Sequence, residues 1–138
     1  MDKRQAQLER ATTVANRHGD LHPWAVAIMA CNMAKKADYD AFIVGLLHDS
    51  IEDEYFVEDE LVTDFDDVVA RAVMILTRRD GERYADYVAR IKAADGQEGR
   101  LARKVKLADA TVNLERCVNE FGYSSLEERY RMVIKELS

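Results

Sequence analysis

An apolar run near the middle of this chain ends directly in a dense group of ionisable side chains. Residues 42–47 read Phe-Ile-Val-Gly-Leu-Leu, and the segment His48–Asp53 (HDSIED) follows at once. If the helix implied by the apolar run continues, His48 and Glu52 lie one turn apart on one face, and Asp49 and Asp53 lie on the next. Burying such groups costs several kcal/mol unless a cation or partner groups offset it. The fold must therefore bring a cation or partners here, or else leave the segment as a solvated helix end.

Helical periodicity dominates the rest of the chain, and no segment shows the sustained alternation of a strand. The 138 residues include one proline and six glycines, which favours helices joined by short turns. We predict an all-α fold, a single-domain helical bundle spanning residues 1–138. The predicted helices are Lys3–Arg17, Pro23–Lys36, Asp38–Asp53, Asp64–Thr77, Glu82–Ala94, Leu101–Phe121 and Ser125–Leu137, with a loop or short helix at 54–60, a turn at 78–81 and a loop around Gly96 and Gly99. Ser124 or Ser125 is the expected cap of the last helix.

Charge and composition disfavour several classes of protein. Hydrophobic residues make up 48% of the chain and charged residues 33%, as in a globular protein, and the net charge of −6 argues against a general nucleic-acid binder. No segment approaches the roughly 18 apolar residues of a membrane span, and the N-terminal region lacks the apolar core of a signal peptide. We therefore expect a cytoplasmic protein without nucleic-acid or membrane partners. Cys31 and Cys117 are interpreted as small apolar residues, with a disulfide between them as the less favoured alternative.

Further polar residues in helical contexts complete a candidate metal site. His22 directly precedes Pro23, and Asp109 lies in the middle of a predicted helix, where an aspartate is costly without a partner. Together with the histidine–aspartate pair at 48–49, they form a mixed nitrogen and oxygen ligand set that suits Mn²⁺, Fe²⁺ or another first-row divalent ion. The spacing alone is not specific, because neither HExxH nor paired CxxC is present. Taken alone, a histidine such as His22 is more often a satisfied or solvent-exposed side chain, and an aspartate such as Asp109 is more often paired with a cation, for instance Lys106 or Arg116.

The order His22, His48-Asp49, Asp109 resembles the HD superfamily of metal-dependent phosphohydrolases, in which an H…HD…D set holds the metal on a helical bundle. A closer likeness is to the hydrolase domain of the RelA/SpoT family. The matching blocks are an HDxxED block at 48–53 after Gly-Leu-Leu, a VKLAD…N block at 105–109 with Asn113, a "VxxLT" helix end at 73–78 and an "HPxxVA" block at 22–27. The likeness covers most of the chain, from about residue 10 to about residue 115, in the right order.

The resemblance implies a function and a set of roles. It implies a bound Mn²⁺-type ion and hydrolysis of guanosine tetra- or pentaphosphate at the 3′-pyrophosphate. Glu52 and Asp53 follow the metal ligands by one turn, where they could act as general base and acid. The residues expected to contact the anionic nucleotide substrate are Arg17, Lys106 and Asn113, with Arg78 and Arg79 as outer contacts. Asn113 could instead hold Asp109, and Tyr84 and Tyr87 could stack on a base but more often such residues pack in a core or at its rim.

One segment departs from the family pattern. The family usually has a longer connection, with basic and aromatic substrate contacts, between an "RxxH-G" stretch and the "HP" block. Here only Asp20 and Leu21 separate Arg17-His18-Gly19 from His22. The metal ligands remain, but we expect weaker discrimination between bases. The alternatives are therefore a hydrolase of other nucleotides, a non-catalytic nucleotide-binding HD module, and a purely structural helical protein; the oligomeric state is left open.

Overall fold

The computed structural model describes residues 2–33, 35–120 and 126–138, and the regular elements in this part of the chain are eight α-helices, with no strand. The helices are α1 (Lys3–Asn16), α2 (His22–Cys31), α3 (Tyr39–Leu47), α4 (Glu58–Asp64), α5 (Asp67–Leu76), α6 (Tyr84–Ala93), α7 (Gly96–Glu120) and α8 (Glu127–Leu137). The prediction of an all-α fold is confirmed. None of the described helices is long and apolar enough to cross a membrane.

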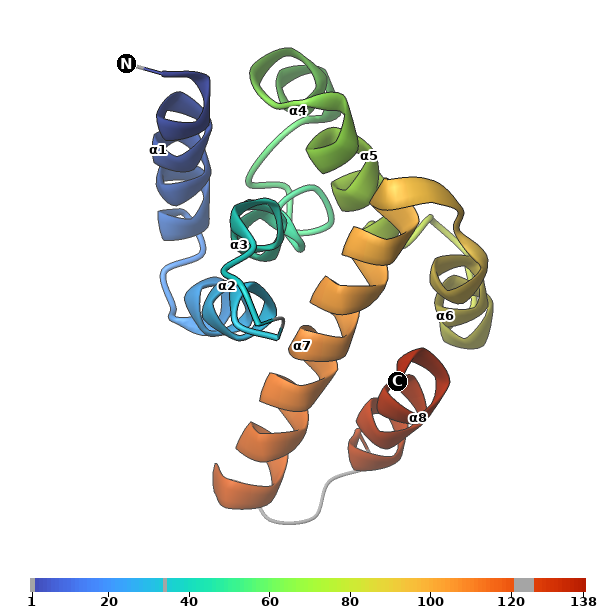
Figure 1. The fold of residues 1–138 in the computed structure, drawn as a ribbon. Helices are drawn as coiled ribbons and strands as arrows, with labels where there is room; N and C mark the ends of the chain where they lie inside the picture. The colour runs from blue at the N-terminus through green and yellow to red at the C-terminus, as the bar shows by residue number, and fades with distance from the viewer. Residues whose placement is uncertain (1, 34, 121–125) are drawn as a thin grey trace.

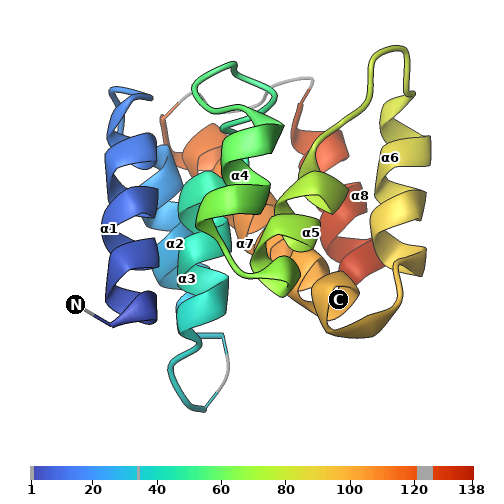
Figure 2. The ribbon, with the colours of Figure 1, turned by 90° about the horizontal axis from the view of Figure 1, so that it is seen from above.

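The long helix α7 is the centre of the arrangement (Figure 1). It contacts α2, α3 and α5 on one side and α6 and α8 on the other, while α1 packs on α3. Figure 2 shows α1, α2 and α3 together at one end of the molecule and α6 and α8 at the other. The core between these helices is built from branched aliphatic side chains and alanines, such as Val26, Leu46, Leu47, Leu76 and Val105, all essentially inaccessible to solvent. Cys31 and Cys117 are also buried.

Several helix ends follow local sequence signals. Asp2 caps α1 by accepting a hydrogen bond from the Gln5 backbone N–H, and Asp38 caps α3 by accepting one from Ala41. Gly19 has a φ of 72°, the left-handed conformation that ends a helix. Pro23 lies in the first turn of α2, where its missing N–H costs nothing. The helix starts near residues 3, 23 and 38 were therefore predictable from the sequence.

The prediction that one helix continues from Asp38 to Asp53 was wrong. Helix α3 ends at Leu47, and residues 48–54 form successive turns. The Nδ1 atom of His48 lies 2.6 Å from the Gly45 carbonyl oxygen, which residue 49 would use in a continued helix. The Ser50 N–H instead bonds to the Leu47 carbonyl, in a tighter i to i−3 contact. A polar side chain thus competes for the backbone and stops the helix.

Other boundaries also differ. Helix α2 ends at Cys31, not Lys36, α5 starts at Asp67, and a short helix α4 occupies part of the acidic region. The predicted loop around Gly96 and Gly99 is the first turn of α7. A Cβ atom on Gly99 would lie 2.1 Å from the Ala94 carbonyl oxygen, so this glycine serves close backbone packing. The expected cap at Ser124 or Ser125 lies outside the described residues.

Candidate metal centre

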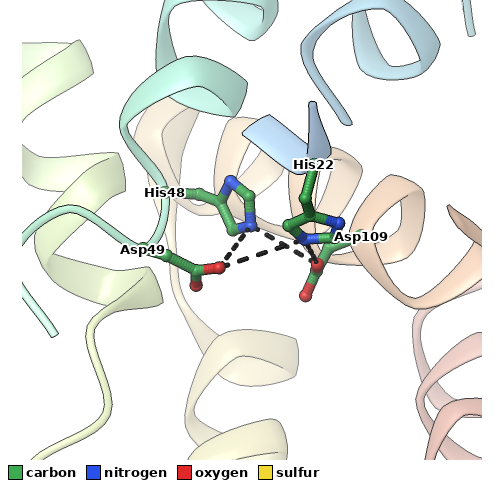
Figure 3. A group of neighbouring side chains, drawn as sticks. All are labelled: His22, His48, Asp49 and Asp109. Carbon is green, nitrogen blue, oxygen red and sulfur yellow. Dashed lines mark hydrogen bonds and ion pairs between the residues drawn. The ribbon is translucent and has the colours of Figure 1, made fainter. Parts of the chain in front are cut away.

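Three separate parts of the fold bring the four predicted ligands together (Figure 3). His22 is the first residue of α2, His48 and Asp49 follow the end of α3, and Asp109 lies on α7. One ligand atom from each of the four residues lies within 4.8 Å of all the others. His48 and Asp109 are buried, whereas His22 and Asp49 are partly exposed. The centre is therefore anchored in the core and open on one side.

The two histidine Nε2 atoms lie close to the carboxylate oxygens of the two aspartates. His22 Nε2 lies 2.9 Å from Asp109 Oδ1 and 4.0 Å from Asp49 Oδ2. His48 Nε2 lies 3.1 Å from Asp49 Oδ2 and 3.3 Å from Asp109 Oδ1. The two imidazole rings meet edge to face, with their centroids 5.4 Å apart. Both histidines thus direct Nε2 at the same pair of carboxylates (Figure 3).

The orientation of His48 fits a metal ligand. Its Nδ1–H donates to the Gly45 carbonyl oxygen, so in the neutral ring the lone pair is on Nε2. That Nε2 atom is the one buried side-chain nitrogen or oxygen, among the described residues, without a hydrogen-bond partner. Unpartnered buried polar atoms are rare in folded proteins. A divalent ion between Nε2 and the carboxylates would supply the missing interaction.

The electrostatics call for a positive charge at the same place. Burial alone would lower the pKa of His48, but the carboxylates of Asp49 and Asp109 outweigh it and raise that pKa well above its usual value. Without a metal, a proton on Nε2 would balance the two carboxylates. A first-row divalent ion carries more charge and accepts the same imidazole and carboxylate ligands. The cluster could therefore hold a metal ion, although its chemistry does not select one metal.

Asp109 is held by residues of its own helix. Lys106 Nζ lies 3.0 Å from Asp109 Oδ2, and Asn113 Nδ2 donates to Oδ1 at 3.1 Å. Burial would raise the pKa of Asp109, but Lys106 and then His48 hold it well below the usual range. Burial would likewise lower the pKa of Lys106, and the Asp109 charge instead raises it well above normal. Asp109 therefore remains an anion, with Oδ1 facing the two histidines and Oδ2 facing Lys106.

The two residues predicted to be catalytic lie in the turns beside the ligands. Glu52 Oε1 accepts a hydrogen bond from the Arg78 backbone N–H at 2.5 Å, and Asp53 Oδ2 lies 3.6 Å from His18 Nδ1. Partial burial raises the pKa of both carboxyl groups, and the Asp49 charge adds to this effect. A carboxylate with a raised pKa is a stronger base, as proton transfer requires.

The three residues predicted to bind substrate all have protein partners. Arg17 is exposed, and its Nη1 donates to the Tyr55 carbonyl oxygen at 2.8 Å. Lys106 is buried, with its ammonium over the Tyr84 and Tyr87 rings at 5.6 and 5.1 Å from their centroids. These contacts give Lys106 and Asn113 positions behind Asp109, while Arg17 still has free surface toward solvent. Tyr87 is buried core packing, as the commoner alternative predicted.

One open cleft reaches the centre, and a second lies beside Glu52. One, of about 590 Å³, is lined by His22 and by residues of α7 including Val112 and Arg116. The other, of about 440 Å³, is lined by Glu52 and by the 78–83 turn with its three arginines. A small anionic molecule could therefore reach His22 through the first cleft, and the second cleft would bring it to Glu52 beside three arginines. His18, which lies 3.6 Å from Asp53, was not predicted as a site residue. The available signal was its position directly before Gly19, the glycine at the end of the first helix.

Comparison with known proteins gives one line of evidence. No protein-family model matches the chain. A curated relative is the GTP pyrophosphokinase of Streptomyces coelicolor, which is 32% identical over 124 residues. That alignment covers 78% of this chain but only 14% of the relative. The chain therefore spans about one seventh of that protein.

Proposed function

We propose that this chain is a metal-dependent phosphohydrolase that acts on a small nucleotide, with the 3′-pyrophosphate of guanosine tetraphosphate as the first candidate bond. The observation that carries the proposal is the convergence of four ligand atoms within 4.8 Å of one another, with His48 Nε2 left without a hydrogen-bond partner. Mixed imidazole and carboxylate sites of this kind hold divalent ions that activate water. Mn²⁺ is the first candidate ion.

The relative supports a link to nucleotide pyrophosphates. Its name describes transfer of a pyrophosphate group to GTP, and the part aligned here is a small fraction of that protein. We favour hydrolysis over synthesis for this chain, because its His/Asp cluster could hold an ion that activates water and its motifs resemble the hydrolase domain of the RelA/SpoT family. The remainder of the relative has no counterpart in this chain.

The chemistry can be assigned to groups of this chain. When bound, the ion would polarise a phosphate oxygen and lower the pKa of a water molecule. Water attacks the phosphorus attached to the 3′ oxygen, the bond to that oxygen breaks, and guanosine diphosphate and pyrophosphate are released. Of Glu52 and Asp53, one carboxylate takes the proton from the attacking water and the other group gives a proton to the leaving oxygen. The raised pKa values of both groups suit this exchange.

The short connection before His22 bears on the choice of nucleotide. With two residues between Gly19 and His22, the chain has little room for a loop that grips the base. Specificity depends on buried polar groups that a wrong substrate leaves unpaired. We therefore expect hydrolysis of more than one nucleotide, which is also the main alternative to a dedicated alarmone hydrolase.

The test combines metal analysis with a substrate panel. Purified protein is assayed for bound metal and for thermal shift with Mn²⁺ and other first-row ions. Release of pyrophosphate and phosphate is then measured with guanosine tetraphosphate, its adenosine counterpart, nucleoside di- and triphosphates, and cyclic nucleotides. Metal binding together with release from at least one nucleotide is expected. Metal binding without turnover would favour the non-catalytic binding module, and the absence of both would leave a structural protein.

A further inference from the structure

A histidine outside the four-residue centre lies against one of the proposed catalytic acids. His18 follows the end of α1, and the left-handed backbone of Gly19 then turns the chain toward α2. The His18 side chain is only 7% exposed, although its neighbours Arg17 and Gly19 are exposed. The imidazole therefore faces the protein, where it contacts the turns that follow α3.

Three residues of those turns surround the ring. His18 Nδ1 lies 3.6 Å from Asp53 Oδ2, and Nε2 lies 3.4 Å from Ser50 Oγ. The Tyr55 ring packs against it, with centroids 4.6 Å apart. Ser50 is fully buried, so its hydroxyl depends on a protein partner such as His18. One side chain from the end of α1 thus contacts both ends of the 50–55 segment.

The contacts favour one tautomer of the ring. If the Ser50 hydroxyl donates to Nε2, that nitrogen holds the lone pair, and the proton is on Nδ1, facing the Asp53 carboxylate. Burial lowers the pKa of His18, partly opposed by the nearby Asp53 and Asp49 charges, so the neutral ring is favoured. The distance from Nδ1 to Asp53 is longer than a normal hydrogen bond. Catalytic contacts are often long without substrate and tighten when it binds.

We propose that His18 is a positioning residue for Asp53, whose carboxylate it holds in one orientation through Nδ1–H while Ser50 fixes the ring tautomer. The inference rests on the proposed function, since it supplies Asp53 with the orienting partner that a general acid or base needs. It also gives a role to the turn at the end of α1, which the metal ligands do not explain. The competing explanation is that the ring only fills space beside Tyr55.

Two amide substitutions separate these explanations. The amide nitrogen of His18→Asn can replace Nδ1 and keep the Asp53 contact, whereas that of His18→Gln replaces Nε2 and keeps only the Ser50 contact. We expect His18→Gln to lower kcat about 10- to 100-fold, the usual effect of losing such a supporting contact, with KM and metal content unchanged. His18→Asn should stay within about threefold of wild type. Equal losses in both variants, or no loss in either, would overturn the proposal.

A double-variant cycle tests the route of the effect. If His18 acts through Asp53, His18→Gln should cause no further loss of kcat in an Asp53→Asn background. Independent, multiplicative losses would mean that His18 acts elsewhere. Thermal denaturation of all variants shows whether any of them loses activity by unfolding.

A third measurement does not depend on activity. Nitrogen NMR of the metal-free protein, with the ring assigned by comparison with His18→Gln, reports the tautomer directly. A ring protonated at Nδ1, with signals that shift in Asp53→Asn, supports the proposal; a ring protonated at Nε2 overturns it. A wild type that hydrolyses no nucleotide refutes the proposed function instead, and the NMR result still decides whether His18 orients Asp53.

Discussion

The Nδ1 atom of His48 lies 2.6 Å from the carbonyl oxygen of Gly45, and this hydrogen bond ties the candidate metal centre to the packing of α3 on α2. The two helices approach each other closely at Gly45, because a Cβ atom there would lie 2.6 Å from the Ala27 Cα. The residue that orients the ligand is therefore also the residue that sets the helix spacing.

Replacing Gly45 by alanine should damage both features. The added methyl group would force α2 and α3 apart, and overpacking of this kind costs about 1–3 kcal/mol. Because α2 carries His22 and His48 directly follows α3, the metal affinity should fall as well. Urea denaturation measures the first effect and titration calorimetry with Mn²⁺ the second. Gly81→Ala is the matched control: its positive φ costs stability, but nothing lies within 4 Å of the new Cβ, so metal affinity should not change.

Removing Asp109 should expose the cost of a buried, unpaired lysine. Without this carboxylate, the Lys106 side chain is left in the core without its opposite charge, and breaking a buried ion pair in this way costs about 3–5 kcal/mol. Denaturation of Asp109→Ala in a chelator, so that metal loss plays no part, should show this loss. Adding Lys106→Met should recover part of it, because the charge is removed and the side chain can pack on Tyr87. If the second change recovers no stability, the ion pair is not what supports Asp109.

Neutralising the two acids beside the ligands should separate chemistry from metal binding. Glu52→Gln and Asp53→Asn should keep bound metal yet lose turnover by about two to four orders of magnitude, the usual contribution of general acid–base groups. Metal analysis and initial rates measure the two properties in one preparation. Asp59→Asn, an exposed acid on α4, serves as the charge-matched control. Rates near wild type in both variants would show that Glu52 and Asp53 are surface charges without a part in the chemical step.

Arg17 has two assignable roles, and two substitutions distinguish them. Its Nη1 supports the Tyr55 carbonyl oxygen, and its remaining N–H groups are open to an anionic substrate. Arg17→Ala should raise KM more than it lowers kcat, as expected for a binding contact. Arg17→Lys keeps the charge, so a KM close to wild type in that variant would assign the effect to attraction of the substrate. A KM raised equally in both would assign it to support of the 48–55 segment.

Acid should weaken the ion pair that closes the 77–82 turn. Arg90 donates to both carboxylate oxygens of Glu82, at 2.9 and 3.0 Å, and these hydrogen bonds lower the pKa of Glu82 to about 2. Since this pKa is below the unfolded value, the pair stabilises the fold above about pH 4.5 and loses its effect as the pH falls toward 2. At pH 7 the free energy of unfolding of wild type should exceed that of Glu82→Gln by on the order of 1 kcal/mol. This difference in unfolding free energy, measured by urea denaturation from pH 7 to 3, should narrow only below about pH 5. A difference that stays constant over this range would contradict a stabilising Glu82–Arg90 ion pair.

Local sequence determined the helical class, the main helices and the chemical character of the site. Spacing of apolar residues predicts helices, and Asp2, Gly19, Pro23 and Asp38 mark helix ends through contacts a few residues away. The types of the candidate ligands were predictable too, since clustered histidine and aspartate residues beside apolar segments are costly to bury without a cation or other partners. That these ligands meet at one place was implied only by the resemblance, because His22 and His48 lie 26 positions apart in the sequence.

The tertiary structure decided which hydrogen-bond or ion-pair partner each polar side chain of the site has. Helix α3 stops at Leu47 because the His48 side chain hydrogen-bonds to a backbone carbonyl, and the ring then faces the carboxylates of Asp49 and Asp109. Lys106 faces Asp109 rather than solvent, and Arg17 and His18 hold the turns after α3. Each of these outcomes depends on a partner distant in sequence or on burial that changes the energy of a charge. Propensity and spacing describe neighbours along the chain, so they can suggest a pair such as Lys106 and Asp109 but cannot reveal distant partners or the burial of a charge.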